Sequence, residues 1–112
     1  NNIKIFKDWP DEALQKVIID KNTAIITLTH DPKLDDPALE YSLTTDAFYI
    51  GCLGSKKTHN SRILRLKRKG ISEQQLKKLN GPVGISIGAK TPTEIAISII
   101  SQIILFKNTV DA

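Results

Sequence analysis

The chain has 112 residues, a net charge of +4 and a hydrophobic fraction of 40%, values that suit a single soluble globular domain. One cysteine excludes an internal disulfide, and no apolar run is long enough to span a membrane. We therefore expect a cytoplasmic protein without a membrane segment.

The first third of the chain alternates between strand and helix signals. A short apolar run predicts a strand at Ile3–Phe6. Pro10, followed by acidic residues, predicts the start of a helix whose apolar positions continue to Ile18 before Asn22 ends it. The continuous β-branched run Ala24–Thr29 is typical of a strand buried on both faces.

The middle of the chain repeats this alternation. Asp36, followed by a proline, predicts the N-cap of a helix that ends near Thr45. Ala47–Ile50 is the next predicted strand, and Gly51–Ser55 is the predicted loop after it. Lys56–Lys69 is a predicted helix that a glycine terminates.

The last third contains two capping-box patterns, Ser72–Gln75 and Thr91–Glu94, each of which predicts the start of a helix. Between them, Val83–Ile87 is a predicted strand among glycines. The apolar stretch Ile95–Phe106 is interrupted by polar residues and predicts a buried core helix.

The order of these elements predicts an α/β fold of three layers, with a mostly parallel sheet in one domain over residues 1–112. Parallel sheets of this kind bind ligands at the carboxyl ends of their strands. We therefore expect the functional loops after residues 29, 50 and 87 to converge there.

The segment Gly51–Lys57 is the most informative of these loops. Glycines allow the backbone to approach a ligand closely, and the following helix N-terminus favours an anion. Ser55 supplies a hydrogen-bond donor, while Lys56 and Lys57 supply positive charge. The spacing matches neither a P-loop nor the GxGxxG dinucleotide fingerprint, so a tight turn with a serine cap remains the alternative.

His30 and Asp31 follow the strand that precedes this loop. A histidine beside carboxylates can orient a ligand or move a proton, but both side chains can equally bind the loop backbone. No second histidine or cysteine lies at ligand spacing, so we predict no metal site and no catalytic residue.

Two other features have two interpretations each. Nine basic residues and one acidic residue lie between Lys56 and Lys78. This block attracts phosphate, nucleic acid or an acidic partner, or is a solvated helix face. Cys52 is either a reactive thiol in the glycine loop or, as we favour, a small core residue.

Three blocks together resemble the hallmark blocks of the XdhC/CoxI accessory proteins, in the same order and at similar separations. They are residues 28–39 (LTHDPKLDDPAL), 49–58 (YIGCLGSKKT) and 81–99 (GPVGISIGAKTPTEIAISI). The resemblance covers the chain from about Ile3 to Leu105. Ser86 replaces the usual aspartate of the family, and Cys52 replaces a small apolar residue.

The resemblance implies a Rossmann-like C-terminal domain that handles the molybdenum cofactor. Family members bind this cofactor, promote its sulfuration with a cysteine desulfurase, and aid its insertion into a molybdenum hydroxylase such as xanthine dehydrogenase. The family's first glycine-rich βαβ segment should lie upstream of Ile3. We therefore expect a partial domain, either a truncated product or a half-domain completed by another copy, and hence a homo-oligomer.

We therefore expect a non-catalytic, cofactor-binding maturation factor. The alternatives are a nucleotide-binding oxidoreductase-like domain, for which the NAD fingerprint is absent, and an inactive fragment. Nucleic acid is a less favoured partner because no aromatic residue is interleaved with the basic block. The predicted cofactor-binding residues are His30, Asp31, Gly51, Gly54, Ser55, Lys56, Lys57, Gly88 and Thr91.

Overall fold

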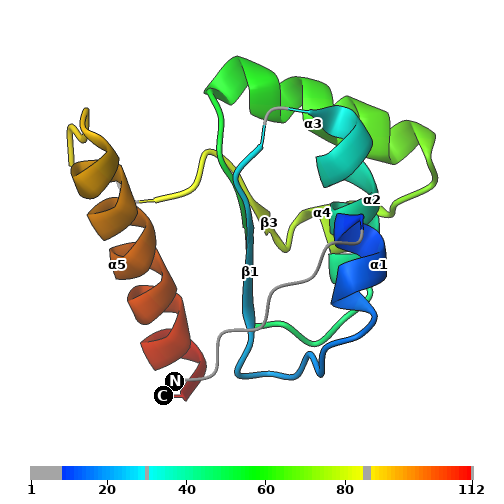
Figure 1. Ribbon diagram of the computed structural model, residues 1–112, viewed down its shortest axis with the longest axis horizontal. Coiled ribbons are helices and arrows are strands. Elements are labelled where there is room, and N and C mark those ends of the chain that lie inside the picture. The colour runs from blue at the N-terminus through cyan, green and yellow to red at the C-terminus, as the bar shows by residue number, and fades with distance from the viewer. Residues whose placement is uncertain (1–8, 30, 85–86, 112) are drawn as a thin grey trace.

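A computed structural model describes residues 9–29, 31–84 and 87–111 (Figure 1). The strand predicted at Ile3–Phe6 lies outside these residues. The described elements are α1 (Pro10–Leu14), β1 (Ala24–Thr27), α2 (Pro32–Ser42), β2 (Tyr49–Cys52), α3 (Lys56–Arg68), α4 (Glu73–Leu76), β3 (Leu79–Asn80) and α5 (Pro92–Asp111).

The three strands form a parallel sheet in the order β1-β2-β3. Ala24 lies opposite Tyr49 and Thr27 opposite Cys52, while Ile50 pairs with Leu79. Helix α5 lies on one side of the sheet, and α1 to α4 lie on the other (Figure 1). The predicted three-layer α/β fold with parallel strands is therefore confirmed.

The third strand begins four residues earlier than predicted. The expected strand was Val83–Ile87, whereas β3 is Leu79–Asn80, and Val83 and Gly84 are not in a strand. Pro82 has no N–H to donate to a ladder, so the regular pairing stops before it. The Val83 N–H still donates to the carbonyl of Cys52, at the end of β2, over 3.1 Å.

Two helix boundaries also differ from prediction. Helix α2 begins at Pro32, with Asp31 as its N-cap, because the Asp31 carboxylate accepts the Lys33 N–H at 3.0 Å. Asp36 is therefore not the cap but a buried residue inside the helix. Helix α1 ends at Leu14 rather than continuing to Ile18, whose side chain is 91% exposed.

The apolar core lies between the sheet and helices α2, α3 and α4. Its buried members are Leu39, Leu43, Ile50, Cys52, Leu66, Leu76 and Leu79. Cys52 is fully buried, which confirms that it is a core residue, and burial raises the pKa of its thiol. Strand β2 is buried along its whole length, as expected of a central strand.

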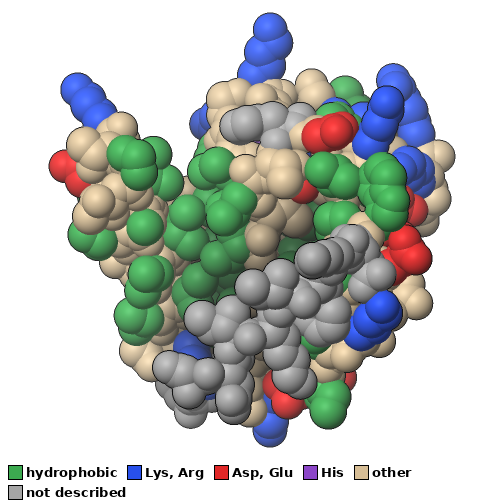
Figure 2. Space-filling view, in the orientation of Figure 1, with side chains coloured by type: hydrophobic (Ala, Val, Ile, Leu, Met, Phe, Trp, Pro, Cys, Tyr) green, Lys and Arg blue, Asp and Glu red, His purple; other side chains and the backbone are tan. Residues whose placement is uncertain are grey.

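Helix α5 is only half-buried, so its prediction as a core helix is wrong in part. Ser98 and Ile99 face the sheet and are buried. A second apolar stripe, Ile97, Ile100 and Ile104, follows the helical repeat on the opposite side and is more than half exposed. Hydrophobic side chains gather on α5 and along the hollow beside it in Figure 2.

Candidate functional site

The carboxyl ends of β1 and β2 lie side by side, and each leads into a helix that begins at the same edge of the sheet. Gly54 in the second connection has a φ of 143°, which favours glycine. The hydroxyl of Ser55 then accepts the Thr58 N–H at 3.1 Å and caps α3. The sequence therefore folds this loop into a sharp turn that opens a capped helix.

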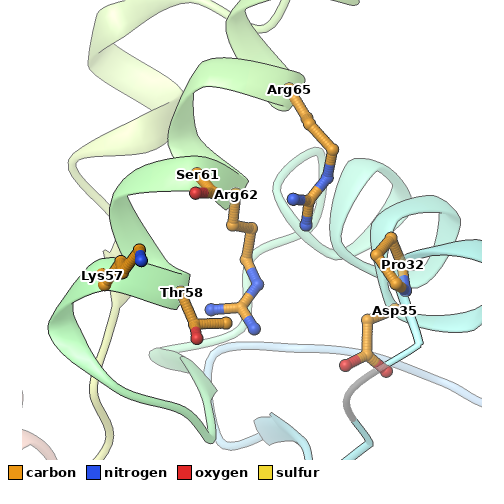
Figure 3. Close-up of a pocket in the computed structure, with 7 residues that line it drawn as sticks. All are labelled: Pro32, Asp35, Lys57, Thr58, Ser61, Arg62 and Arg65. Atoms are coloured by element: carbon orange, nitrogen blue, oxygen red, sulfur yellow. The ribbon is translucent and has the colours of Figure 1, made fainter.

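A crevice of about 210 Å³ lies between the first turn of α2 and the first three turns of α3. Figure 3 shows Arg62 from α3 and Asp35 from α2 pointing into the space between the two helices. The lining residues are Pro32, Asp35, Lys57, Thr58, Ser61, Arg62 and Arg65.

Arg62 is the most unusual residue of this crevice because its charged side chain is 2% exposed. Its Nη2 donates to the carbonyl of Leu53 at 3.3 Å, which ties α3 to the loop before Gly54. Its Nε and Nη1 are buried and have no hydrogen-bond partner among the described residues. Buried polar groups without partners are uncommon, and those of a guanidinium are always charged.

The acidic residues near Arg62 are engaged by other side chains. Arg65 forms a two-bond pair with Asp36, with Nε 2.7 Å from Oδ2 and Nη2 3.2 Å from Oδ1. This hydrogen bonding raises the pKa of Arg65. Asp35 accepts a hydrogen bond from the Thr29 hydroxyl at 2.7 Å. The crevice is therefore lined by two arginines: Arg65, which is paired with Asp36, and Arg62, whose Nε and Nη1 have no hydrogen-bond partner among the described residues.

A second hollow, of about 360 Å³, lies on the other side of the Gly54 turn. Gly54 and Gly88 both line it, so the structure brings two of the predicted glycine positions together. Ser98 of α5 lines this hollow and packs against Gly84. A Cβ at Gly84 would lie 2.4 Å from the Ser98 hydroxyl. The other lining residues are Leu53, Val83, Ile87, Ala89 and Ile95.

The beginning of α5 carries the capping box predicted for it. The Thr91 hydroxyl accepts the Glu94 N–H, and the Glu94 carboxylate accepts the N–H groups of Thr91 and Lys90. These backbone hydrogen bonds lower the pKa of Glu94. Thr91 is thus a helix cap beside the second hollow.

The predicted site residues therefore divide among several positions. Lys57 lines the crevice, whereas Lys56 is exposed on the same turn and lines neither hollow. Asp31 is exposed and caps α2, and His30 lies outside the described residues. Gly51 is buried inside β2, where a Cβ would lie 2.4 Å from Val83.

Sequence reasoning missed Arg62 as a distinct residue. The signal was its spacing: Thr58, Arg62 and the apolar Leu66 follow one another at intervals of four, which places Arg62 on the buried side of α3. His59, on the same helix, is partly buried and packs over Gly81. Burial lowers its pKa.

Two kinds of feature are absent from the described residues. In the ranges 9–29, 31–84 and 87–111, no cluster of three or more His, Cys, Asp or Glu side chains is arranged to hold a metal ion. Within the same ranges, no helix has the length and apolarity needed to cross a membrane.

Comparison with known proteins identifies relatives over most of the chain. Residues 3–103 match the XdhC Rossmann domain family. The molybdenum cofactor insertion chaperone PaoD of Escherichia coli is 34% identical over 99 residues, which are 88% of this chain and 30% of PaoD. A probable xanthine dehydrogenase subunit of Bacillus subtilis is 29% identical over 96 residues, 86% of this chain and 27% of that protein.

A solved structure shares both the sequence and the fold. The crystal structure of a xanthine dehydrogenase from Bacillus halodurans superimposes with a TM-score of 0.72 at 35% identity. The match covers 91% of this chain and 28% of that one. The chain therefore spans less than a third of the length of these relatives.

Proposed function

Because the chain belongs to the XdhC family and matches its Rossmann domain over residues 3–103, we propose that it acts in the maturation of a molybdenum hydroxylase such as xanthine dehydrogenase. The observation that carries the proposal is the similarity to a molybdenum cofactor insertion chaperone over 88% of the chain. In this role the domain binds the molybdenum cofactor in the cytoplasm and aids its sulfuration and insertion. Its partners are the apo-hydroxylase and a cysteine desulfurase.

The carboxyl edge of the sheet suits this role. The hollow between Gly54 and Gly88 leaves backbone accessible for a flat heterocycle, and Gly88 has open space where a side chain would stand. Ser55, Lys56 and Lys57 lie on the adjoining helix turn and favour an anionic group. These residues hold and orient a ligand, and we assign none of them a catalytic role.

Binding measurements test the proposal. Purified protein is titrated separately with molybdenum cofactor, NAD and ATP, and we expect the molybdenum cofactor to bind most tightly. The double variant Lys56→Ala/Lys57→Ala should weaken that binding about fivefold, because two exposed charges at a helix N-terminus are lost.

The double variant Lys77→Ala/Lys78→Ala removes the same charge on the far side of the basic block and serves as the control. Tighter binding of NAD or ATP than of the molybdenum cofactor would contradict the maturation role. Equal binding by both double variants would contradict the location of the site.

We also propose that the protein self-associates through the exposed stripe of α5, defined by Ile97, Ile100 and Ile104. The three side chains are each more than half exposed and lie on one side of a 20-residue helix. Exposed apolar stripes of this kind mark association surfaces. The oligomeric state of the variant Ile100→Lys/Ile104→Lys, measured by sedimentation, tests this part.

A further inference from the structure

We propose that the crevice between α2 and α3 binds a phosphate monoester, with Arg62 as the residue that anchors the phosphate. This inference goes beyond the proposed function, because it concerns the chemistry of one crevice and holds whether or not the protein binds the molybdenum cofactor. It rests on a buried arginine with unused donors, on the local balance of charge, and on the size of the crevice.

The donors of Arg62 carry the first step. Of its guanidinium nitrogens, Nη2 bonds the carbonyl of Leu53, while Nε and Nη1 have no partner among the described residues. The side chain is 2% exposed, yet it lines the crevice and points into it (Figure 3). A guanidinium cannot lose its proton, and Nη1 together with the second N–H of Nη2 forms a planar edge that matches two phosphate oxygens.

The charges around Arg62 carry the second step. Asp36, a buried acid on the facing helix, forms its two-bond pair with Arg65. Lys57 adds a further positive charge to the crevice wall. The first turn of α3 contributes the positive end of its dipole from the same side, and α3 is 13 residues long. The α3 side of the crevice is therefore an anion site.

The opposite wall determines the kind of anion. Asp35 lines the crevice from α2, so a second anionic group on that side of the ligand would be repelled. A phosphate on the Arg62 side with a neutral organic group toward Asp35 avoids this repulsion. Hydroxyl groups on that organic part can donate to the carboxylate. The volume of about 210 Å³ is several times the ~30 Å³ share of one water molecule. Phosphate and a small polar fragment fit together.

Nuclear magnetic resonance titration of the full chain tests the proposal. Amide shifts are followed with ribose 5-phosphate, methyl phosphate and inorganic phosphate as separate probes. We expect saturable shifts at the first turn of α2 and along α3 as far as Arg65, where the crevice lies. The affinity should be largest for ribose 5-phosphate and smallest for inorganic phosphate. Arg62→Lys keeps the charge but loses the fork, and should weaken ribose 5-phosphate binding about tenfold.

Two exposed-lysine variants keep the test decisive if the Arg62 variant is unstable. Lys57→Ala should weaken binding about threefold, whereas Lys78→Ala, outside the crevice, should leave it unchanged. Several results would overturn the proposal: no saturable shifts at the crevice, equal losses in both lysine variants, or a folded Arg62→Lys protein that binds as tightly as the parent. Inorganic phosphate binding as tightly as ribose 5-phosphate would also overturn it, because the Asp35 wall would then select nothing.

Discussion

The two sides of the sheet are built on different principles. On the side of α2, α3 and α4, seven buried residues form one continuous apolar cluster. On the other side, α5 is the only described helix (Figure 1). The apolar stripe on its outer face is exposed. The first side gains its stability from burial of apolar area, which is the larger driving force in folding.

Polar contacts add to the few apolar contacts, such as that of the buried Ile99, that hold α5 to the sheet. The Gln102 side chain accepts from the Tyr49 hydroxyl and from the Gly84 N–H, the latter at 3.0 Å, and its Nε2 donates to the Gly84 carbonyl at 3.3 Å. Phe106 meets the edge of the Tyr49 ring at 5.2 Å. We call these three residues, Tyr49, Gly84 and Gln102, the clamp. Its hydrogen bonds fix the position of α5 on the sheet.

The largest expected effect is on the apolar side. Leu39→Ala should lower the free energy of unfolding by about 3 kcal/mol, because a fully buried side chain leaves a cavity. Ile100→Ala on the outer face of α5 should change it by less than about 0.5 kcal/mol. Urea unfolding of both variants measures the contrast, and equal losses would show that the outer stripe of α5 is not exposed to solvent.

Removing the clamp should have a smaller effect. Gln102→Ala leaves Gly84 and the Tyr49 hydroxyl without their shared partner, and we expect a loss of about 2 kcal/mol. Hydrogen exchange of α5 amides should speed up while that of α3 stays unchanged. Asn108→Ala on the same helix is the control for helix propensity. Uniform acceleration of exchange over both helices would contradict an independently held α5.

A pH series isolates the Tyr49 hydroxyl. Burial raises its pKa from 10.0 to about 12, so folding favours the neutral phenol. The stabilisation is complete below pH 10 and is lost as the pH rises through 10 to 12. Tyr49→Phe should cost about 1 kcal/mol at neutral pH and remove this alkaline loss. A parent protein whose stability is flat between pH 10 and 12 would refute the assignment.

The smallest effect on stability is expected from the outer stripe of α5. Ile100→Lys/Ile104→Lys should change the free energy of unfolding by less than about 0.5 kcal/mol, since both side chains already meet solvent. Sedimentation should show that the same variant associates less than the parent. A parent that stays monomeric at every concentration would contradict the proposed association surface.

Local signals explain what the sequence could predict. The alternation of elements predicted the parallel sheet, and the hydroxyls of Ser55, Ser72 and Thr91 each cap the helix predicted to follow. Cap and strand patterns depend on residues close together in the chain, so they can be found from neighbouring residues alone.

The failures concern choices that only tertiary contacts decide. Asp31-Pro32 and Asp36-Pro37 both fit a helix start, and the chain uses the earlier pair because Asp36 meets Arg65 from α3. In the candidate site, too, local features could be predicted and features that depend on tertiary packing could not. The Ser55 turn was predictable, whereas the burial of Arg62 depends on how α3 packs against the sheet and α2.

The clamp also has a consequence for rotation about the axis of α5. Each residue of a helix turns it by about 100°, so a roll that hid Ile97, Ile100 and Ile104 would carry Gln102 away from Gly84. Such a roll would break both amide bonds and the contact with the Tyr49 hydroxyl at once. These hydrogen bonds therefore fix the rotation of α5 about its own axis, and they keep the isoleucine stripe facing outward.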